Sequence, residues 1–75
     1  MPRLNLTFQQ VLSILEANGF VIVRHNGTSH RQLRAVINGE VRMTTLAGKL
    51  SDEVAIGTLQ AIMRQSGLPK KRFRP

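Results

Sequence analysis

Residues 33–44, Leu-Arg-Ala-Val-Ile-Asn-Gly-Glu-Val-Arg-Met-Thr, decide the fold of this 75-residue chain. Two extended runs flank Asn38-Gly39, and both residues of that dipeptide accept the positive φ angles of a type I′ turn. With the turn placed there, the cross-strand pairs are Ile37–Glu40, Val36–Val41, Arg34–Met43 and Leu33–Thr44. The sequence therefore predicts a β-hairpin with strands of about 30–37 and 40–46.

The alternation of this hairpin has one exception. Leu33, Ala35 and Ile37 share one face, but Arg42 falls opposite Ala35 on that same face. A β-bulge could move the arginine to the other face, and the sequence alone does not place one.

A helix and a strand are predicted before the hairpin. Thr7 and Gln10 fit a capping box, in which each side chain satisfies the other residue's free backbone N–H. Apolar residues at helical spacing follow, namely Phe8, Val11, Leu12 and Leu15. Asn18-Gly19 ends this helix, because glycine accepts the left-handed conformation after a helix. The β-rich run at 20–23 predicts a strand.

A polar loop at 47–53 and a second helix are predicted after the hairpin. The helix covers about 56–66, with helical spacing at Leu59, Ile62, Met63 and Ser66. Gly67-Leu68-Pro69 stops it. The expected fold is an α+β two-layer sandwich of order α-β-β-β-α, with an antiparallel three-stranded sheet and both helices on one face. It resembles the double-stranded RNA-binding domain, and it occupies one domain, 1–75, with a basic tail at about 69–75.

The charge of the chain indicates an anionic partner. There are 11 Lys and Arg against 4 Asp and Glu, a formal net charge of +7. Such a surface attracts polyanions, and it could equally meet an acidic protein. Four of the positive charges, Lys70, Lys71, Arg72 and Arg74, lie in the predicted tail. Those charges could be solvated or could contact nucleic acid.

The composition also limits which cofactors the chain could bind and indicates where in the cell it is expected. The chain has no cysteine, so a zinc site would be limited to histidine and carboxylate ligands. Its two histidines lie five residues apart with no carboxylate close in sequence, so we predict no metal and no cofactor. No apolar run approaches the roughly 20 residues that cross a bilayer, and no signal peptide is evident. We therefore expect a cytoplasmic protein without a membrane partner.

The stretch 24–31, Arg-His-Asn-Gly-Thr-Ser-His-Arg, holds the candidate chemistry. Histidine gains or loses a proton near neutral pH. His30 is the stronger candidate because it begins a strand just past a turn. His25, at the opposite lip of that turn, is predicted to be a bystander or a minor phosphate contact.

The neighbouring residues could bind phosphate or serve ordinary structural roles. Arginine has the geometry to grip phosphate, and the candidates are Arg24, Arg31 and Arg34, although Arg31 and Arg34 could simply face solvent. Gly27 could allow a close backbone approach to phosphate, or could only form the turn. Thr28 and Ser29 could donate to a phosphate oxygen, or could cap the turn.

RNA cleavage fits this set because it needs little machinery. The substrate carries its own nucleophile, the 2′-hydroxyl, beside the scissile phosphate. A general base removes the hydroxyl proton, and cationic groups stabilise the negative charge of the phosphorane. One histidine with arginines could therefore act as a ribonuclease without metal. A Ser-His-Asp hydrolase is not indicated, since the chain lacks an evident nucleophile elbow.

Residues 8–68 resemble the HicA family of bacterial and archaeal toxins. The resemblance rests on the order of elements, on Gly27-Thr28-Ser29-His30 after the first strand, and on the segment Gly57-Thr58-Leu59-x-x-Ile62-x-x-x-x-Gly67-Leu68. The chain departs from the family pattern in two places. A threonine interrupts the common Gly-Ser-His, and Leu33 stands where an aromatic residue is often found.

The resemblance implies a ribosome-independent mRNA interferase with a fold like the double-stranded RNA-binding domain. The family's catalytic histidine corresponds to His30. It also implies an acidic-faced HicB-type antitoxin that occludes the site, with DNA contacted only indirectly through the toxin–antitoxin complex. Two alternatives remain open. One is a non-catalytic RNA-binding module of the same fold, and the other is a basic protein that meets only an acidic protein partner.

Overall fold

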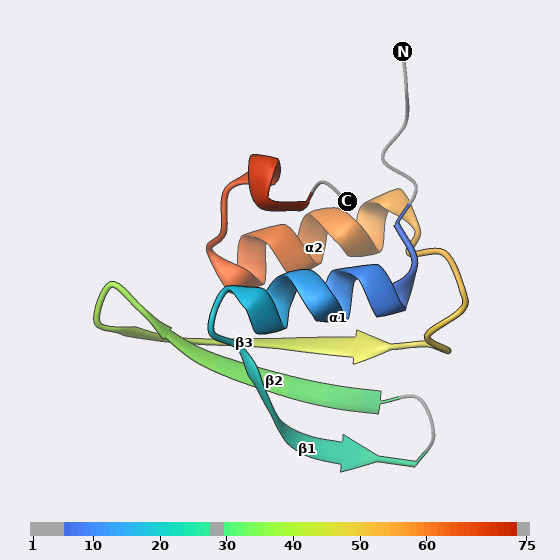
Figure 1. Ribbon diagram of the computed structural model, residues 1–75, viewed down its shortest axis with the longest axis horizontal. Coiled ribbons are helices and arrows are strands. Elements are labelled where there is room, and N and C mark those ends of the chain that lie inside the picture. The colour runs from blue at the N-terminus through green and yellow to red at the C-terminus, as the bar shows by residue number, and fades with distance from the viewer. Residues whose placement is uncertain (1–5, 28–29, 74–75) are drawn as a thin grey trace.

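The computed structural model describes residues 6–27 and 30–73 of the chain. Two helices and three strands follow one another in the predicted order, and a short 3-10 helix, η1, ends the fold. The elements are α1 (Phe8–Ala17), β1 (Val21–Asn26), β2 (His30–Ile37), β3 (Glu40–Ala47), α2 (Ile56–Ser66) and η1 (Lys70–Phe73). Figure 1 shows α1 and α2 side by side over one face of the sheet, which confirms the α+β sandwich.

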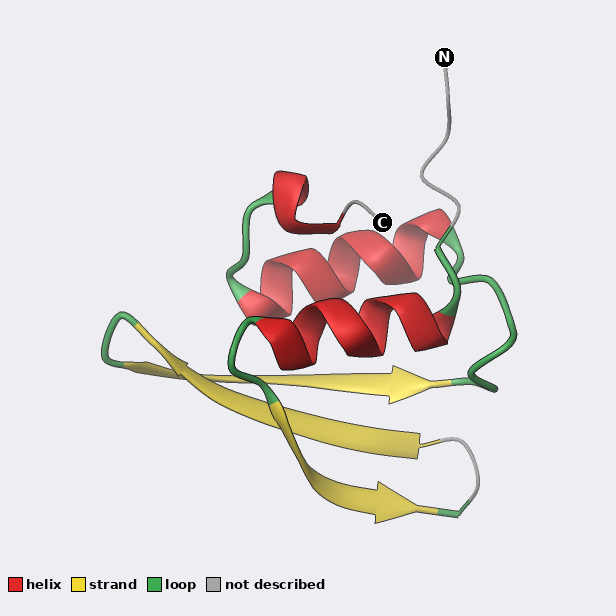
Figure 2. Cartoon of the chain, viewed as in Figure 1, coloured by secondary structure: helices red, strands yellow, loops and turns green. Residues whose placement is uncertain are grey.

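The sheet is antiparallel with strand order β1-β2-β3, so β2 is the central strand. The type I′ turn is confirmed by positive φ angles of 52° at Asn38 and 81° at Gly39. All four cross-strand pairs predicted from that turn are present, and the β2–β3 register continues unbroken from Ile37–Glu40 to His30–Ala47. In Figure 2 no described element covers the face of the sheet opposite the helices.

Arg42 stays opposite Ala35, so no bulge in the hairpin moves it off the helix side. Its guanidinium lies at the C-terminal end of α2, where a Cβ added to Gly67 would come within 3.1 Å of the arginine Cζ. The Nη2 atom of Arg42 also forms an ion pair with Oε2 of Glu40 at 3.2 Å. A cation at a helix C-terminus is favourable, and the aliphatic stem can cover the edge of the core.

The helix ends follow the sequence signals closely. Thr7 and Gln10 form the predicted capping box, with Thr7 N donating to Gln10 Oε1 at 2.9 Å and Gln10 N donating to Thr7 Oγ1 at 3.2 Å. The first two backbone N–H groups of α1 donate to Asp52 and Leu50 carbonyls of the loop before α2. The N-terminus of α1 is therefore occupied by the protein itself. Gly67 ends α2 in the left-handed conformation, with φ of 71°.

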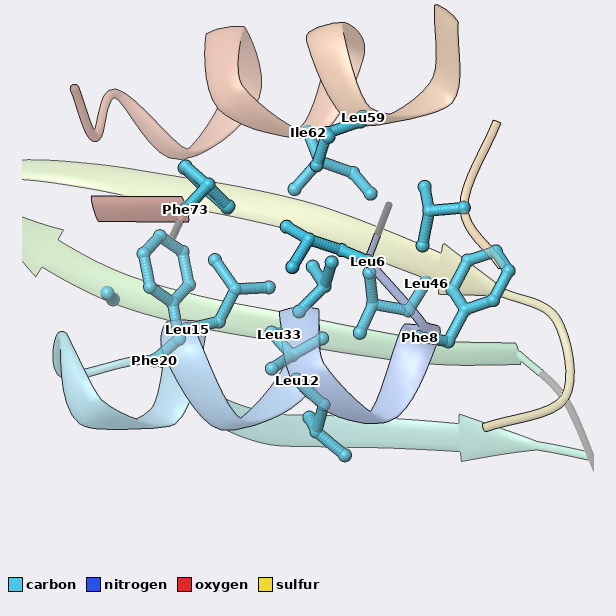
Figure 3. Packing of buried hydrophobic residues seen from close by; sticks show 13 residues of the cluster. Leu6, Phe8, Leu12, Leu15, Phe20, Leu33, Leu46, Leu59, Ile62 and Phe73 are labelled. Carbon is cyan, nitrogen blue, oxygen red and sulfur yellow. The ribbon is translucent and has the colours of Figure 1, made fainter. Parts of the chain in front are cut away.

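The buried core lies between the helices and one face of the sheet (Figure 3). Its members are Leu6, Phe8, Val11, Leu12, Leu15, Phe20, Leu33, Ala35, Leu46, Val54, Leu59, Ile62 and Phe73. Phe73 was placed in a basic tail by sequence, but it is fully buried and η1 contacts α1. Lys70, Lys71 and Arg72 remain exposed on η1. Part of the predicted tail is thus a docked helix with an apolar anchor.

Candidate functional site

His30 is the first residue of β2, and its side chain is exposed. Its strand is paired on both sides, with Asn26 of β1 opposite His30 in one direction and Ala47 of β3 in the other. A residue at the end of a central strand has a backbone held by two ladders. The imidazole therefore projects from a rigid support, as the sequence predicted.

Strand alternation places two of the predicted arginines on the same face as His30. Side chains at positions i, i+2 and i+4 of a strand share a face, so His30, Gln32 and Arg34 point together. Leu33 and Ala35, which alternate with them, are buried against the helices. Arg24 pairs with Gln32 and joins this set. We call the side of the sheet that carries these residues the open face.

A β-bulge in β1 controls which residues reach the open face. Ile22 pairs with Leu33, but Arg24, two residues on, pairs with Gln32. The register has therefore slipped by one residue at Val23. A one-residue slip turns every later side chain to the other face. Without it Arg24 would lie opposite Arg31 on the helix side.

His25 and Arg31 form a cross-strand pair on the helix side of the sheet. His25 is exposed, whereas Arg31 is half-buried and its Nη1 atom has no hydrogen-bond partner among the described residues. The structure therefore separates the two histidines onto opposite faces. Of the predicted phosphate ligands, it groups Arg24 and Arg34 with His30 and sets Arg31 apart.

The turn between β1 and β2 contains three more of the predicted residues. Gly27 is exposed and has φ of 63°, in the left-handed region that favours glycine. No heavy atom of the described residues lies within 4 Å of a Cβ added there, so glycine is favoured by the backbone conformation. Thr28 and Ser29 lie outside the described residues.

The positive charge around His30 is not neutralised within the sheet. Neither β1 nor β2 contains an Asp or Glu. Across residues 6–27 and 30–73, the ion pair between Arg42 and Glu40 is the single salt bridge, and it lies at the hairpin end of the sheet. Arg24 and Arg34 are exposed and free to bind an anion.

Two further observations bear on the chemistry. Within the described part of the chain, no group of three or more His, Cys, Asp or Glu side chains is arranged to hold a metal ion. Gln32 was not singled out from the sequence, yet it lies between His30 and Arg34 on the open face and beside Arg24. Its spacing of two residues from His30 is the signal that could have identified it.

Comparison with known proteins gives one match. Residues 8–68 match the family described as HicA toxin of bacterial toxin-antitoxin. No curated protein and no solved structure gives a significant match. In the described residues, no helix has both the length and the apolar character needed to span a membrane. The matched range contains both helices, the whole sheet and the turn before His30.

Proposed function

The chain belongs to the HicA toxin family of toxin–antitoxin systems, and from this premise we propose that it is a ribosome-independent endoribonuclease that cleaves mRNA. His30 serves as its acid–base residue, and a HicB-type antitoxin neutralises it. The observation that carries the proposal is the open face, where an exposed imidazole lies with two arginines that pair with no carboxylate of the described residues. DNA is contacted only through the complex with the antitoxin.

The proposed reaction uses the 2′-hydroxyl of RNA as nucleophile. Neutral His30 takes the proton from that hydroxyl, and the oxygen attacks the adjacent phosphorus. The bond from phosphorus to the 5′ oxygen breaks, water gives a proton to the leaving oxygen, and the hydroxide left behind takes the proton back from His30. The products are a 2′,3′-cyclic phosphate and a 5′-hydroxyl. Arg24 and Arg34 bind the phosphate and stabilise the charge that develops on its oxygens.

Gln32 and Arg31 are two further polar residues of β2 to consider in the proposed reaction. The Gln32 amide lies between the histidine and the two arginines on the open face, so it can donate to a phosphate or sugar oxygen. Arg31 is on the other side of the sheet, and its Nη1 is buried without a hydrogen-bond partner among the described residues, so we assign it no contact with the phosphate beside His30. In this proposal Gly27 allows a close approach of the backbone to phosphate, and the hydroxyls of Thr28 and Ser29 donate to a phosphate oxygen.

The decisive experiment compares His30→Ala with His25→Ala. Both histidines are exposed and lie in adjacent strands, but they occupy opposite faces of the sheet. We expect His30→Ala to lower cleavage by about 10²–10⁴-fold, the usual contribution of a positioned acid–base group. Growth arrest on induction should disappear, while the fold and RNA binding persist. His25→Ala should cleave RNA at a rate close to that of the wild type.

Two results would overturn this assignment. A folded His30→Ala variant with full toxicity would remove the histidine from the chemistry. A wild-type protein that binds RNA with steep salt dependence but yields no cut product would instead be a non-catalytic RNA-binding module.

Cleavage is also expected to persist in excess EDTA, because the proposed step needs no metal. The measurement is the initial rate of cleavage with EDTA and after addition of Mg²⁺. Loss of cleavage in EDTA and its rescue by Mg²⁺ would assign the reaction to a metal-dependent mechanism.

A further inference from the structure

Four exposed apolar side chains form a patch on the open face at the end away from His30. Val21, Val36, Val41 and Met43 are 58%, 59%, 55% and 48% exposed, and we call them the valine–methionine patch. Val36 pairs with Val41, whereas Val21 and Met43 both pair with Arg34 from opposite sides. The patch therefore spans all three strands and flanks Arg34 on both sides.

No described element of the chain covers this patch. The helices and η1 pack on the other face, where the core side chains lie (Figures 1 and 3). Single exposed apolar residues are common, but a contiguous group on a flat sheet face marks an interaction surface. The chain thus carries a second feature on the open face besides the cationic group around His30.

The patch suits neither RNA nor a second copy of this chain. Single-stranded RNA is held by cations and by aromatic rings that stack on its bases. All three aromatic residues of the chain, Phe8, Phe20 and Phe73, are buried at 7%, 1% and 0% exposure. A second copy would carry the same formal charge of +7 and would bring two Arg34 side chains together. Like charges across an interface oppose association.

We infer that the valine–methionine patch is the docking surface for an acidic protein that presents apolar side chains. The partner's apolar groups would cover the patch, and its carboxylates would pair with Arg24 and Arg34. Among the described residues, no Asp or Glu of β1, β2 or β3 lies on the open face, so no negative charge there repels an acidic partner. This inference rests on the proposed function, in which the acidic partner is the antitoxin.

The distance along β2 makes docking separable from the chemistry. Val36 lies six positions along β2 from His30, which corresponds to roughly 20 Å at about 3.3 Å per residue. A standard interface covers about 800 Å² on each partner, enough to extend from the patch to His30. Arg34 is the one group shared by the patch and the proposed reaction, and the test below leaves it unchanged; the apolar side chains themselves lie away from His30. Substitutions in the patch should therefore weaken neutralisation without slowing cleavage.

The test uses a triple variant, Val36→Thr/Val41→Thr/Met43→Gln. These substitutions keep the side-chain size and the net charge, and threonine is favourable in strands. The matched control is Ile56→Thr, because Ile56 is also exposed, at 57%, but lies on α2. The probe is the purified protein encoded by the reading frame adjacent to this gene. Calorimetry gives its affinity, and a fluorescent RNA gives the cleavage rate.

We expect the triple variant to bind the probe about 100-fold more weakly and to cleave RNA within twofold of the wild-type rate. Ile56→Thr should match the wild type in both measurements. Unchanged affinity in the triple variant would overturn the docking surface, as would a probe that is not acidic or does not bind. A wild-type dimer in sedimentation that the triple variant loses would instead assign the patch to a second copy. The affinity does not depend on cleavage, so failure of the ribonuclease proposal remains distinguishable.

Discussion

Replacing Phe73 tests whether the basic C-terminal segment is part of the folded domain. The side chain is fully buried and belongs to the same core cluster as Leu15 and Phe20. Phe→Ala substitutions in a core cost about 3–5 kcal/mol, from lost burial and from the cavity left behind. A domain of this size has a free energy of unfolding of only about 4–11 kcal/mol, at roughly 0.05–0.15 kcal/mol per residue. Phe73→Ala should therefore remove a large fraction of the stability of the whole protein.

The assay is urea denaturation followed by far-ultraviolet circular dichroism, because the chain has no Trp or Tyr for fluorescence. If Phe73→Ala does not fold, Phe73→Leu provides a milder change that removes three carbons and costs about 1–2 kcal/mol. At about 4–8 °C per kcal/mol, the leucine variant should melt about 4–16 °C lower. Lys71→Ala is the control, since Lys71 lies exposed on the same short helix and should change stability by at most about 0.5 kcal/mol. A Phe73→Ala variant that loses less than about 1 kcal/mol would show that η1 is not docked.

Two further predictions concern packing and charge. Gly48→Ala should destabilise the protein by about 1–3 kcal/mol, because the added Cβ would overlap Cε2 of the buried Phe8 ring. Gly57→Ala is its matched control and should stabilise the protein by up to about 1 kcal/mol, since Gly57 lies in α2 with nothing within 4 Å of the added Cβ among the described residues. Urea denaturation measures the free energy of unfolding of both variants. Equal changes in the two variants would contradict the contact between Gly48 and Phe8. Arg34→Gln should weaken RNA binding and reduce the salt slope of log K by about 0.7, the value for one lost phosphate contact on a single strand. Lys49 is an exposed charge outside the sheet, so Lys49→Gln should leave that slope unchanged in filter binding. An equal change in both variants would mean that RNA responds to the net charge of the protein and not to a site on the open face.

Local sequence signals predicted most of the fold correctly because each one specifies its own neighbourhood. Asn38-Gly39 determines a turn of two residues, and the turn determines every pair of the β2–β3 ladder. The capping box and Gly67 determine where a helix begins and where another ends. The first strand was predicted less completely, since it begins at Val21 and runs three residues past the β-rich run 20–23.

The errors and omissions involve contacts between distant parts of the chain. Phe73 is a single apolar residue in a basic run, so no periodicity marked it as core, and its burial depends on helix α1 far back in the sequence. Arg42 faces the helix side without a bulge, because the end of α2 accommodates its charge. The helix-side position of Arg31, in contrast, was available from alternation with Leu33.

The bulge at Val23 settles a question that the sequence left open, namely which residues accompany His30. In a regular ladder continued from the pair Ile22–Leu33, His25 would lie opposite His30, and Arg24 would lie opposite Arg31. That register would place two guanidinium groups directly across from each other, which is destabilising in a sheet. The slip by one residue pairs Arg24 with Gln32 and His25 with Arg31. One unpaired residue in an edge strand therefore relieves an arginine–arginine contact and separates the histidines. It also adds a second cation to the face that carries His30.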